Sequence, residues 1–411
     1  MIMKRLPFVL TILLVLLMVM SGCTKRHNLT SDNWSNLRPL STVDTSFVMG
    51  YSYTHDVDVT GLETQLICGS ENGIEAMSIL NFTGLPDSLV VIGQPTLKII
   101  ATRRSAVGAN PLNLSFFKLN QDWAVDSTDV ITDANITPLA VPDFTVPNTI
   151  PTGDSTITTM FVNIPTSVIE NWETTDVTGF NPVIKASVGQ WMEMLSNEGL
   201  NGPLLHFKYH EPGDTVTYSY TSHPSKDSYR ITGTQTNLSN NVWGLKNLLP
   251  QRMFFRFGLP ANIFTYQDST LSDSDNILSD TDRKRMTINK AELVLYLKNN
   301  SSYYKDKKCV FYSYHVLSDT LVSPVVLTDA DLEGIGNTSE YTITDSSFVK
   351  IDITDIVMAY TSEERANNGI VIKTKSEMQN FGKLDFWSYV DAPAGKKPYI
   401  KITYSAPYFD R

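Results

Sequence analysis

Carboxylates gather in one segment of the chain, where their oxygens could ligate a hard cation. The segment contains five aspartates: Asp268, Asp273, Asp275, Asp280 and Asp282. It departs from an EF-hand loop, because Leu278 stands in place of the loop's glycine and Lys284 in place of its final glutamate. Two interpretations remain open. The segment is either a Ca²⁺ site or a solvated loop whose charge is balanced by the basic run Arg283-Lys284-Arg285. Apart from Ca²⁺, the sequence predicts no cofactor.

Signatures of catalysis are missing from the sequence. There is no G-x-S-x-G nucleophile elbow and no glycine-rich phosphate loop. Among the six histidines, His206 and His210 resemble a helical metal pair, but they lie in a strand-like run, where side chains four residues apart are too distant for one ion. The paired carboxylates that a glycosidase needs cannot be singled out among 43 acidic residues. We therefore expect a protein that is not an enzyme.

Aromatic side chains are abundant, with 18 Tyr and 6 Trp, and exposed rings are surfaces on which sugar rings stack. The candidates lie in polar loops or just beyond a strand: Trp243, the pair Tyr303-Tyr304, and Trp123. The alternative for each ring is packing in a core. The formal net charge of -10 disfavours nucleic acid and suits neutral or cationic ligands.

The chain has three cysteines, Cys23, Cys68 and Cys309, and none has the spacing of a metal site. Cys68 and Cys309 lie in apolar, strand-like runs. They are either two buried thiols or a disulfide that joins the two halves of the chain.

The N-terminus has the pattern of an export signal. Lys4-Arg5 precede an almost wholly apolar stretch of about 15 residues, shorter than the ~20 that span a bilayer. Ser21-Gly22-Cys23 follows, so residues 1–22 resemble a bacterial lipoprotein signal peptide, with Met20 where leucine is usual. The resemblance implies a lipid on Cys23 that anchors the protein in a membrane. An uncleaved membrane anchor is the alternative. Thr24, in place of aspartate, resembles lipoproteins forwarded to the outer membrane of diderm bacteria.

The remainder of the chain is typical of β structure. Short runs rich in Val, Ile, Tyr and Phe, such as Leu97–Ala101 and Ala291–Leu297, are punctuated by Gly, Pro, Asn and Asp. Helical patterns are few, and the best are Ser187–Leu195 and Thr354–Tyr360. An insertion around 173–196 predicts a surface helix.

The chain also matches itself in six places, in the same order. The pairs are Phe82–Pro86 with Phe257–Pro260, Leu97–Ala101 with Ala291–Leu297, Leu114–Leu119 with Val310–Val316, Phe161–Ile164 with Val349–Ile351, Leu204–Phe207 with Ile370–Lys373, and Ser219–Ile231 with Ser388–Ile402. A copy of about 170 residues is the size of a whole domain. We predict an all-β protein of two tandem jelly-roll-like antiparallel β-sandwiches with a few short helices. After a polar tether and lead-in at 23–59, the sandwiches span 60–234 and 235–406, and 407–411 form a tail.

The second copy resembles the DNRLRE-type repeat domains. The matching segments are Lys350–Val357, Asn368–Lys373, Phe386–Ser388 and Lys397–Tyr404, although the string that names the family is absent. The resemblance implies a β-sandwich similar to carbohydrate-binding modules of secreted and cell-surface proteins.

Three functions remain open. The favoured hypothesis is a lipid-anchored envelope protein that displays two sandwich modules for adhesion or polysaccharide binding. The second is a structural or assembly component that contacts other envelope proteins. The third and weakest is a polysaccharide-degrading enzyme.

Overall fold

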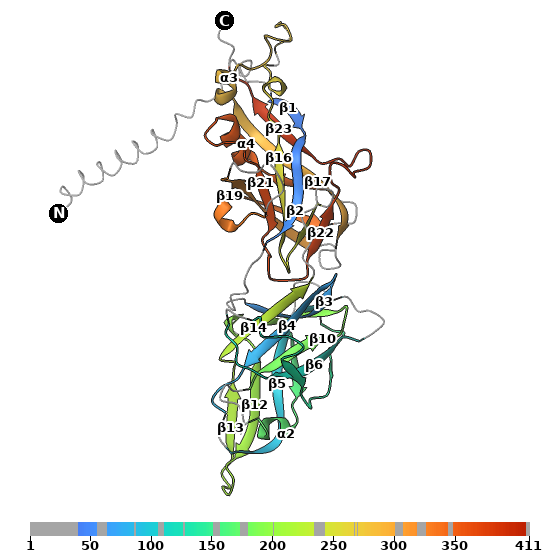
Figure 1. The fold of residues 1–411 in the computed structure, drawn as a ribbon, viewed down its shortest axis with the longest axis vertical. Coiled ribbons are helices and arrows are strands. Elements are labelled where there is room, and N and C mark those ends of the chain that lie inside the picture. Colours follow the sequence, from blue (N-terminus) through green and yellow to red (C-terminus); the bar gives the residue numbers. More distant parts are fainter. Residues whose placement is uncertain are drawn as a thin grey trace, which may run out of the picture. The chain divides into compact units, whose positions relative to one another are not determined.

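The fold is described here from a computed structural model (Figure 1). It describes residues 40–55, 64–85, 88–105, 111–125, 128–150, 157–172, 180–199, 201–233, 243–266, 268, 270–300, 307–318, 326–343 and 348–407. In these ranges the chain is mainly β structure, and the strands form two large antiparallel sheets. The predicted all-β class of two β-sandwiches is confirmed.

The first sheet contains the strands between residues 65 and 233. They are β3 (Gln65–Glu71), β4 (Ile74–Asn81), β5 (Val90–Arg104), β6 (Asn113–Leu119), β7 (Ile136–Pro138), β8 (Phe144–Thr145), β9 (Thr158–Asn163), β10 (Pro182–Ala186), β11 (Trp191–Leu195), β12 (Leu204–His210), β13 (Tyr218–Ser222) and β14 (Lys226–Gly233). Their order is β13-β12-β5-β11-β3-β4-β10-β6-β7, with β14 beside β4, β9 beside β5 and β8 beside β6.

The second sheet combines strands from both sides of the first. They are β1 (Leu40–Thr45), β2 (Phe47–Thr54), β15 (Trp243–Lys246), β16 (Gln251–Phe257), β17 (Thr287–Asn300), β18 (Lys307–Val316), β19 (Leu332–Ile343), β20 (Phe348–Asp352), β21 (Ile370–Thr374), β22 (Lys383–Phe386) and β23 (Tyr399–Ser405). Their order is β1-β23-β17-β22-β15-β16-β21-β18-β19, with β2 beside β16 and β20 beside β17.

The two sheets repeat one strand order. Strands β3 to β7 of the first sheet correspond in position to β15 to β19 of the second, and β9 corresponds to β20. The positions of β13 and β14 are taken in the second sheet by β1 and β2, which come from the other end of the chain. Figure 1 shows β2, in blue, among orange and red strands. The second sandwich is therefore completed by strands that precede the first.

The structure corrects three details of the sequence prediction. Residues 40–54, expected within the tether and lead-in, form β1 and β2, and the Tyr51 and Tyr53 side chains of β2 are fully buried. The expected surface helix at 173–196 is replaced in its described part by β10 and β11. Strand β23 corresponds to β12, and β13 and β14 correspond to β1 and β2, so the matches of Leu204–Phe207 with Ile370–Lys373 and of Ser219–Ile231 with Ser388–Ile402 are wrong.

Short helices complete the fold: α2 (Thr166–Glu170), α3 (Asp280–Arg285), α4 (Thr354–Thr361), η2 (Asn197–Gly199), η3 (Ala261–Ile263) and η5 (Asp329–Asp331). Helix α4 confirms the predicted helix at Thr354–Tyr360. Contacts divide the chain into a small unit around Ala261–Thr287 and a large unit, with Thr42–Pro260 and Ile288–Thr403, that holds most of both sheets.

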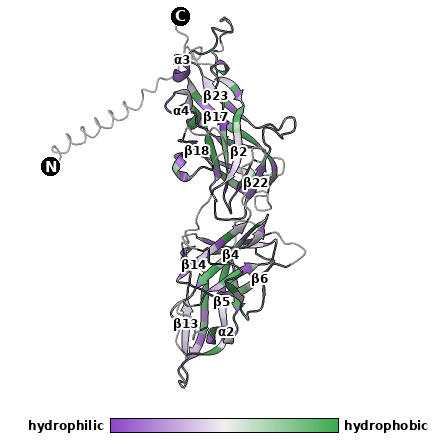
Figure 2. Ribbon diagram, in the orientation of Figure 1, coloured by the Kyte–Doolittle hydropathy of each residue, from purple (hydrophilic) through white to green (hydrophobic). Residues whose placement is uncertain are grey.

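Alternation of buried and exposed residues explains why these segments are strands. In β23 every second side chain, Ile400, Ile402 and Tyr404, is fully buried, whereas the residues between them are partly exposed. Figure 2 shows hydrophobic residues along the strands of each sheet and hydrophilic ones along α3. One face of each such strand therefore belongs to a core, and the other is free to carry a site.

Candidate functional site

The two predicted tryptophans are core residues. Trp243 is 2% exposed, its Nε1 donates to the Gly50 carbonyl over 3.1 Å, and its ring packs edge-on against Phe47 and Phe255. A Cβ on Gly50 would lie 2.5 Å from the Trp243 ring, so the contact is close. Trp123 is 4% exposed, and its Nε1 donates to Asn181. Neither ring offers a face to a ligand, and Tyr303 and Tyr304 lie outside the described residues.

The acidic segment is folded into local turns. The Asp268 carboxylate accepts from the Thr270 backbone, and Asp275 accepts from Ser272. Asp280 pairs with Arg283 at 3.3 Å. Asp282 accepts hydrogen bonds from the hydroxyls of Ser279 and Tyr266, which lower the pKa of its carboxyl.

Asp273 is exposed. Within the described ranges, no three His, Cys, Asp or Glu side chains are grouped to hold a metal ion, so these five aspartates are not brought together as a Ca²⁺ site.

The anchor region is not described. Residues 1–39, which include Cys23, lie outside the described ranges. No helix in the part of the chain that the structure describes combines the length and apolarity of a membrane span. Cys68 and Cys309 are both buried, on β3 and β18, and no disulfide joins them.

The structure reveals instead an aromatic row on the outer face of the second sandwich. It consists of Phe348 on β20, Tyr296 on β17 and Tyr399 on β23, three strands that are neighbours in the sheet. Phe348 lies opposite Tyr296, with ring centroids 5.8 Å apart. Burial raises the pKa of Tyr399, and so does Tyr296, which hydrogen-bonds to it.

Strand alternation forces these rings outward. Val349 and Ile351 of β20, and Leu293 and Leu295 of β17, are fully buried, so Phe348 and Tyr296 lie on the opposite face of these strands; that face is covered at Val294, which is 1% exposed. The Phe348 side chain is consequently 45% exposed, and Tyr296 and Tyr399 are partly exposed. Because neighbouring strands lie about 4.8 Å apart, rings on three strands span roughly 10 Å. The row is therefore aromatic across this width, with the Phe348 and Tyr296 rings inclined at 52° to one another.

Polar and charged side chains surround the aromatic row. The Lys350 ammonium lies 5.5 Å from the centre of the Phe348 ring, a cation–π distance. Asp44 on β1 and Glu292 on β17 are close enough to raise the pKa of Tyr399 further. Glu292 pairs with Lys290 at 2.7 Å. Rings with a rim of hydrogen-bonding groups suit a ligand that has apolar faces and hydroxyl edges.

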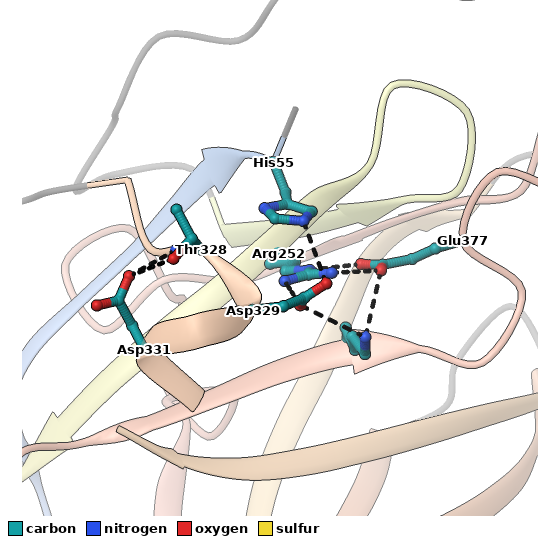
Figure 3. A network of polar contacts seen from close by, with 7 residues as sticks. His55, Arg252, Thr328, Asp329, Asp331 and Glu377 are labelled. Carbon is teal, nitrogen blue, oxygen red and sulfur yellow. Dashed lines mark hydrogen bonds and ion pairs between the residues drawn. The ribbon is translucent and has the colours of Figure 1, made fainter. Parts of the chain in front are cut away.

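A second polar feature of this sandwich is the charged network around Arg252 (Figure 3). The Arg252 side chain, on β16, is 1% exposed. Its Nε and Nη2 donate to the two Glu377 carboxylate oxygens over 2.8 and 2.7 Å, and Nη1 donates to Asp329 over 2.7 Å. This is the bidentate geometry of a strong, charge-assisted pair.

Lys373 and His55 border the network. Lys373 Nζ lies 3.7 Å from Glu377 and 3.9 Å from Asp329, and His55 Nε2 lies 3.6 Å from Asp329. Burial would raise the pKa of Asp329, but hydrogen bonds from Arg252 and its charge hold that pKa below the usual value. Burial and Arg252 both lower the pKa of His55, which favours neutral imidazole. The Asp329 carboxyl is thus kept ionised, and both carboxylates accept hydrogen bonds from Arg252.

The network joins four segments rather than forming a reaction centre. It links the end of β2, strand β16, η5 and the turn after β21, and η5 is itself fixed by hydrogen bonds from the Thr328 backbone and hydroxyl to Asp331. A glycosidase would need one carboxyl free as an acid and another as a base or nucleophile. Glu377 and Asp329 instead share one guanidinium, so the arrangement fits a structural role.

Sequence reasoning missed both features. Phe348 precedes a strand that was recognised from Val349 onward, and an exposed ring looks the same in sequence as a buried one. In comparisons with known proteins, no protein-family model matches the chain, and no curated protein matches it. The resemblance to DNRLRE-type domains therefore stays a prediction.

Proposed function

We propose that this chain is an exported envelope lipoprotein, anchored through a lipid on Cys23, that binds neutral polysaccharide through its β-sandwiches and catalyses no reaction. The anchor rests on the sequence of residues 1–23. The ligand class rests on one observation, the aromatic row of Phe348, Tyr296 and Tyr399.

Stacking is the main attraction that such a surface offers. A pyranose presents axial C–H groups on one face, which pack against an aromatic ring as other apolar groups do, while its hydroxyls need hydrogen-bonding partners at the edges. The row supplies the rings, and Lys350, Asp44 and Glu292 supply partners. The acidic net charge of -10 disfavours polyanions, so neutral chains are the expected class.

Affinity electrophoresis through gels that contain soluble neutral glucans, xylans or mannans tests this proposal. The protein used is the mature chain with Cys23→Ser, which removes the lipid. We expect at least one polysaccharide to retard the protein, and Phe348→Ala to weaken that retardation about tenfold, equivalent to ~1.4 kcal/mol.

Val390→Ala is the matched control, because Val390 is 71% exposed in the same sandwich but outside the aromatic row. Thermal unfolding should be unchanged in both variants, since neither side chain is in a core. Equal retardation of wild type, Phe348→Ala and Tyr296→Ala would show that the row is not the site.

A structural or assembly role is the second candidate, because β13 is an exposed sheet edge. Among the described strands β13 pairs only with β12, and its sequence, Tyr218–Ser222, carries no charge or proline that would discourage pairing with another strand. Co-purification of an envelope protein that is lost on Thr221→Pro, with no retention on any glycan, would favour this role.

A further inference from the structure

The first sandwich carries an exposed phenylalanine on β9, the strand that corresponds to β20 of the second. The outward-facing residues of β9 are Thr159, Phe161 and Asn163. Ala101 of β5 and Leu297 of β17 lie beside the same bulge, so in the strand register Phe161 is equivalent to Lys350, and Thr159 is equivalent to Phe348. Phe161 lies opposite Lys98 of β5, whereas Phe348 lies opposite Tyr296 of β17, two positions further along that strand. Both copies thus carry a phenylalanine on the outward face of this strand, two positions apart.

Packing does not account for Phe161. Its side chain is 59% exposed, whereas Met160 and Val162 on either side are 2% and 1% exposed. An aromatic ring left in water loses the stabilisation that burial would give, about 1.5–3 kcal/mol. An exposed phenylalanine on the same face of the equivalent strand in two diverged copies therefore calls for a role outside the core.

A row of hydrogen-bonding side chains runs beside Phe161. The register places Asn163 of β9 opposite Thr96 of β5, Thr96 opposite His206 of β12, and His206 opposite Thr221 of β13. His206 Nδ1 and Thr221 Oγ1 are 2.8 Å apart, which holds the imidazole in place. Amide, hydroxyl and imidazole groups across four neighbouring strands form a neutral polar strip at the edge of one exposed ring.

We infer that the first sandwich holds a second binding face for neutral sugar chains, with Phe161 as its stacking ring and Asn163, Thr96 and His206 as partners for hydroxyls. This inference rests on the proposed function and extends it: the chain has two sites of one ligand class. Two linked sites bind one polymer with an avidity that exceeds either affinity, by as much as 10²–10⁴-fold where the polymer reaches both.

Calorimetry on the full mature chain with Cys23→Ser tests the inference, with neutral hexasaccharides of glucose, xylose and mannose as probes. The wild type should bind two molecules of at least one hexasaccharide. Phe161→Ala and Phe348→Ala should each bind one, and the double variant none. Ile157→Ala is the matched control, because Ile157 is 61% exposed just before β9, and it should still bind two.

The outcomes separate the two proposals. One bound molecule, lost in Phe348→Ala and kept in Phe161→Ala, overturns the second face but supports the proposed function. Two bound molecules that neither substitution removes place both sites elsewhere and overturn the inference. Failure of the wild type to bind any probe overturns the proposed function together with the inference. Self-association in sedimentation that Phe161→Ala abolishes, without sugar binding at this face, would assign the ring to a contact between copies.

Discussion

Substitution of Arg252 by alanine should destabilise the second sandwich by about 3 kcal/mol. Removal of one partner from a buried ion pair costs ~3–5 kcal/mol, because the other charge is left without compensation. Arg252 is 1% exposed and Glu377 12% exposed, so this pair is desolvated. We expect a loss of stability at the lower end of this range for two reasons.

The first reason is that the Asp329 side chain is 65% exposed, so water replaces the partner that it loses. The second is that Lys373 Nζ, 3.7 Å from Glu377, can approach the freed carboxylate. Arg252→Lys should cost less than alanine, because the ammonium keeps the charge but cannot donate to both oxygens of Glu377 in parallel.

Native-state hydrogen exchange of the β16 and β21 amides, read by mass spectrometry, gives the opening free energy of this sandwich directly. Lys308→Ala is the control, since Lys308 forms an exposed pair with Glu340, with side chains 70% and 51% exposed, and should leave exchange unchanged. A loss below about 1 kcal/mol in Arg252→Ala would refute the view that this network holds its four segments together.

Three further outcomes follow from the geometry. Trp243→Ala should destabilise the second sandwich by about 3–5 kcal/mol in urea unfolding, because the substitution empties a core position and removes a hydrogen bond. A variant that keeps its stability but loses glycan retention would contradict the assignment of Trp243 to the core. The stability of the second sandwich should fall in acid, as pH drops through the lowered pKa of Asp329, and Asp329→Asn should reduce that dependence in denaturant titrations at pH 3 to 6. Burial, and then the nearby Glu198, raise the pKa of Asp227 to about 7 in the folded protein. Between about pH 4 and 7 the Asp227 carboxyl is therefore protonated in the folded state and ionised in the unfolded chain. The first sandwich should therefore lose stability as pH rises from about 4 to 7, and Asp227→Asn should flatten that slope in exchange measurements on β14; an unchanged slope would contradict this.

Much of the fold could be predicted because strand alternation and duplication leave local marks. The runs at Leu97–Ala101 and Leu114–Leu119 and their partners in the second half are strands at equivalent positions. Helix α4 was also visible, as an apolar pattern with helical spacing. These features depend on neighbours in sequence, which a single chain displays.

The pairing of β2 with β16, about 200 residues away, and of β1 with β23, about 360 residues away, could not be predicted. Strands β1 and β2 pair with β23 and β16 because the second sandwich lacks two strands of its own. That gap is a property of the complete topology and leaves no mark in the local sequence. Ser187–Leu195 was misread as helical because its Trp and Met residues fit either period; in β11, buried on both faces, Trp191, Met192 and Met194 are all in the core.

The candidate site was missed for a related reason. Trp243 closely follows Asn240-Asn241 in sequence, yet β15 carries it into the core. Phe348 lies between Ser347 and Val349, and its place in β20 turns it to solvent. Whether a ring is exposed depends on strand register and on what covers the sheet, and neither is encoded by the immediate neighbours of the residue.

Ring-specific NMR gives the most direct test of the binding surface. With ¹³C-labelled aromatic side chains in the mature protein, titration with the retained neutral hexasaccharide should shift the ring signals of Phe348 and Tyr296 and leave those of Trp243 and Trp123 in place. Saturable sugar binding that leaves the Phe348 and Tyr296 rings unshifted would contradict the account.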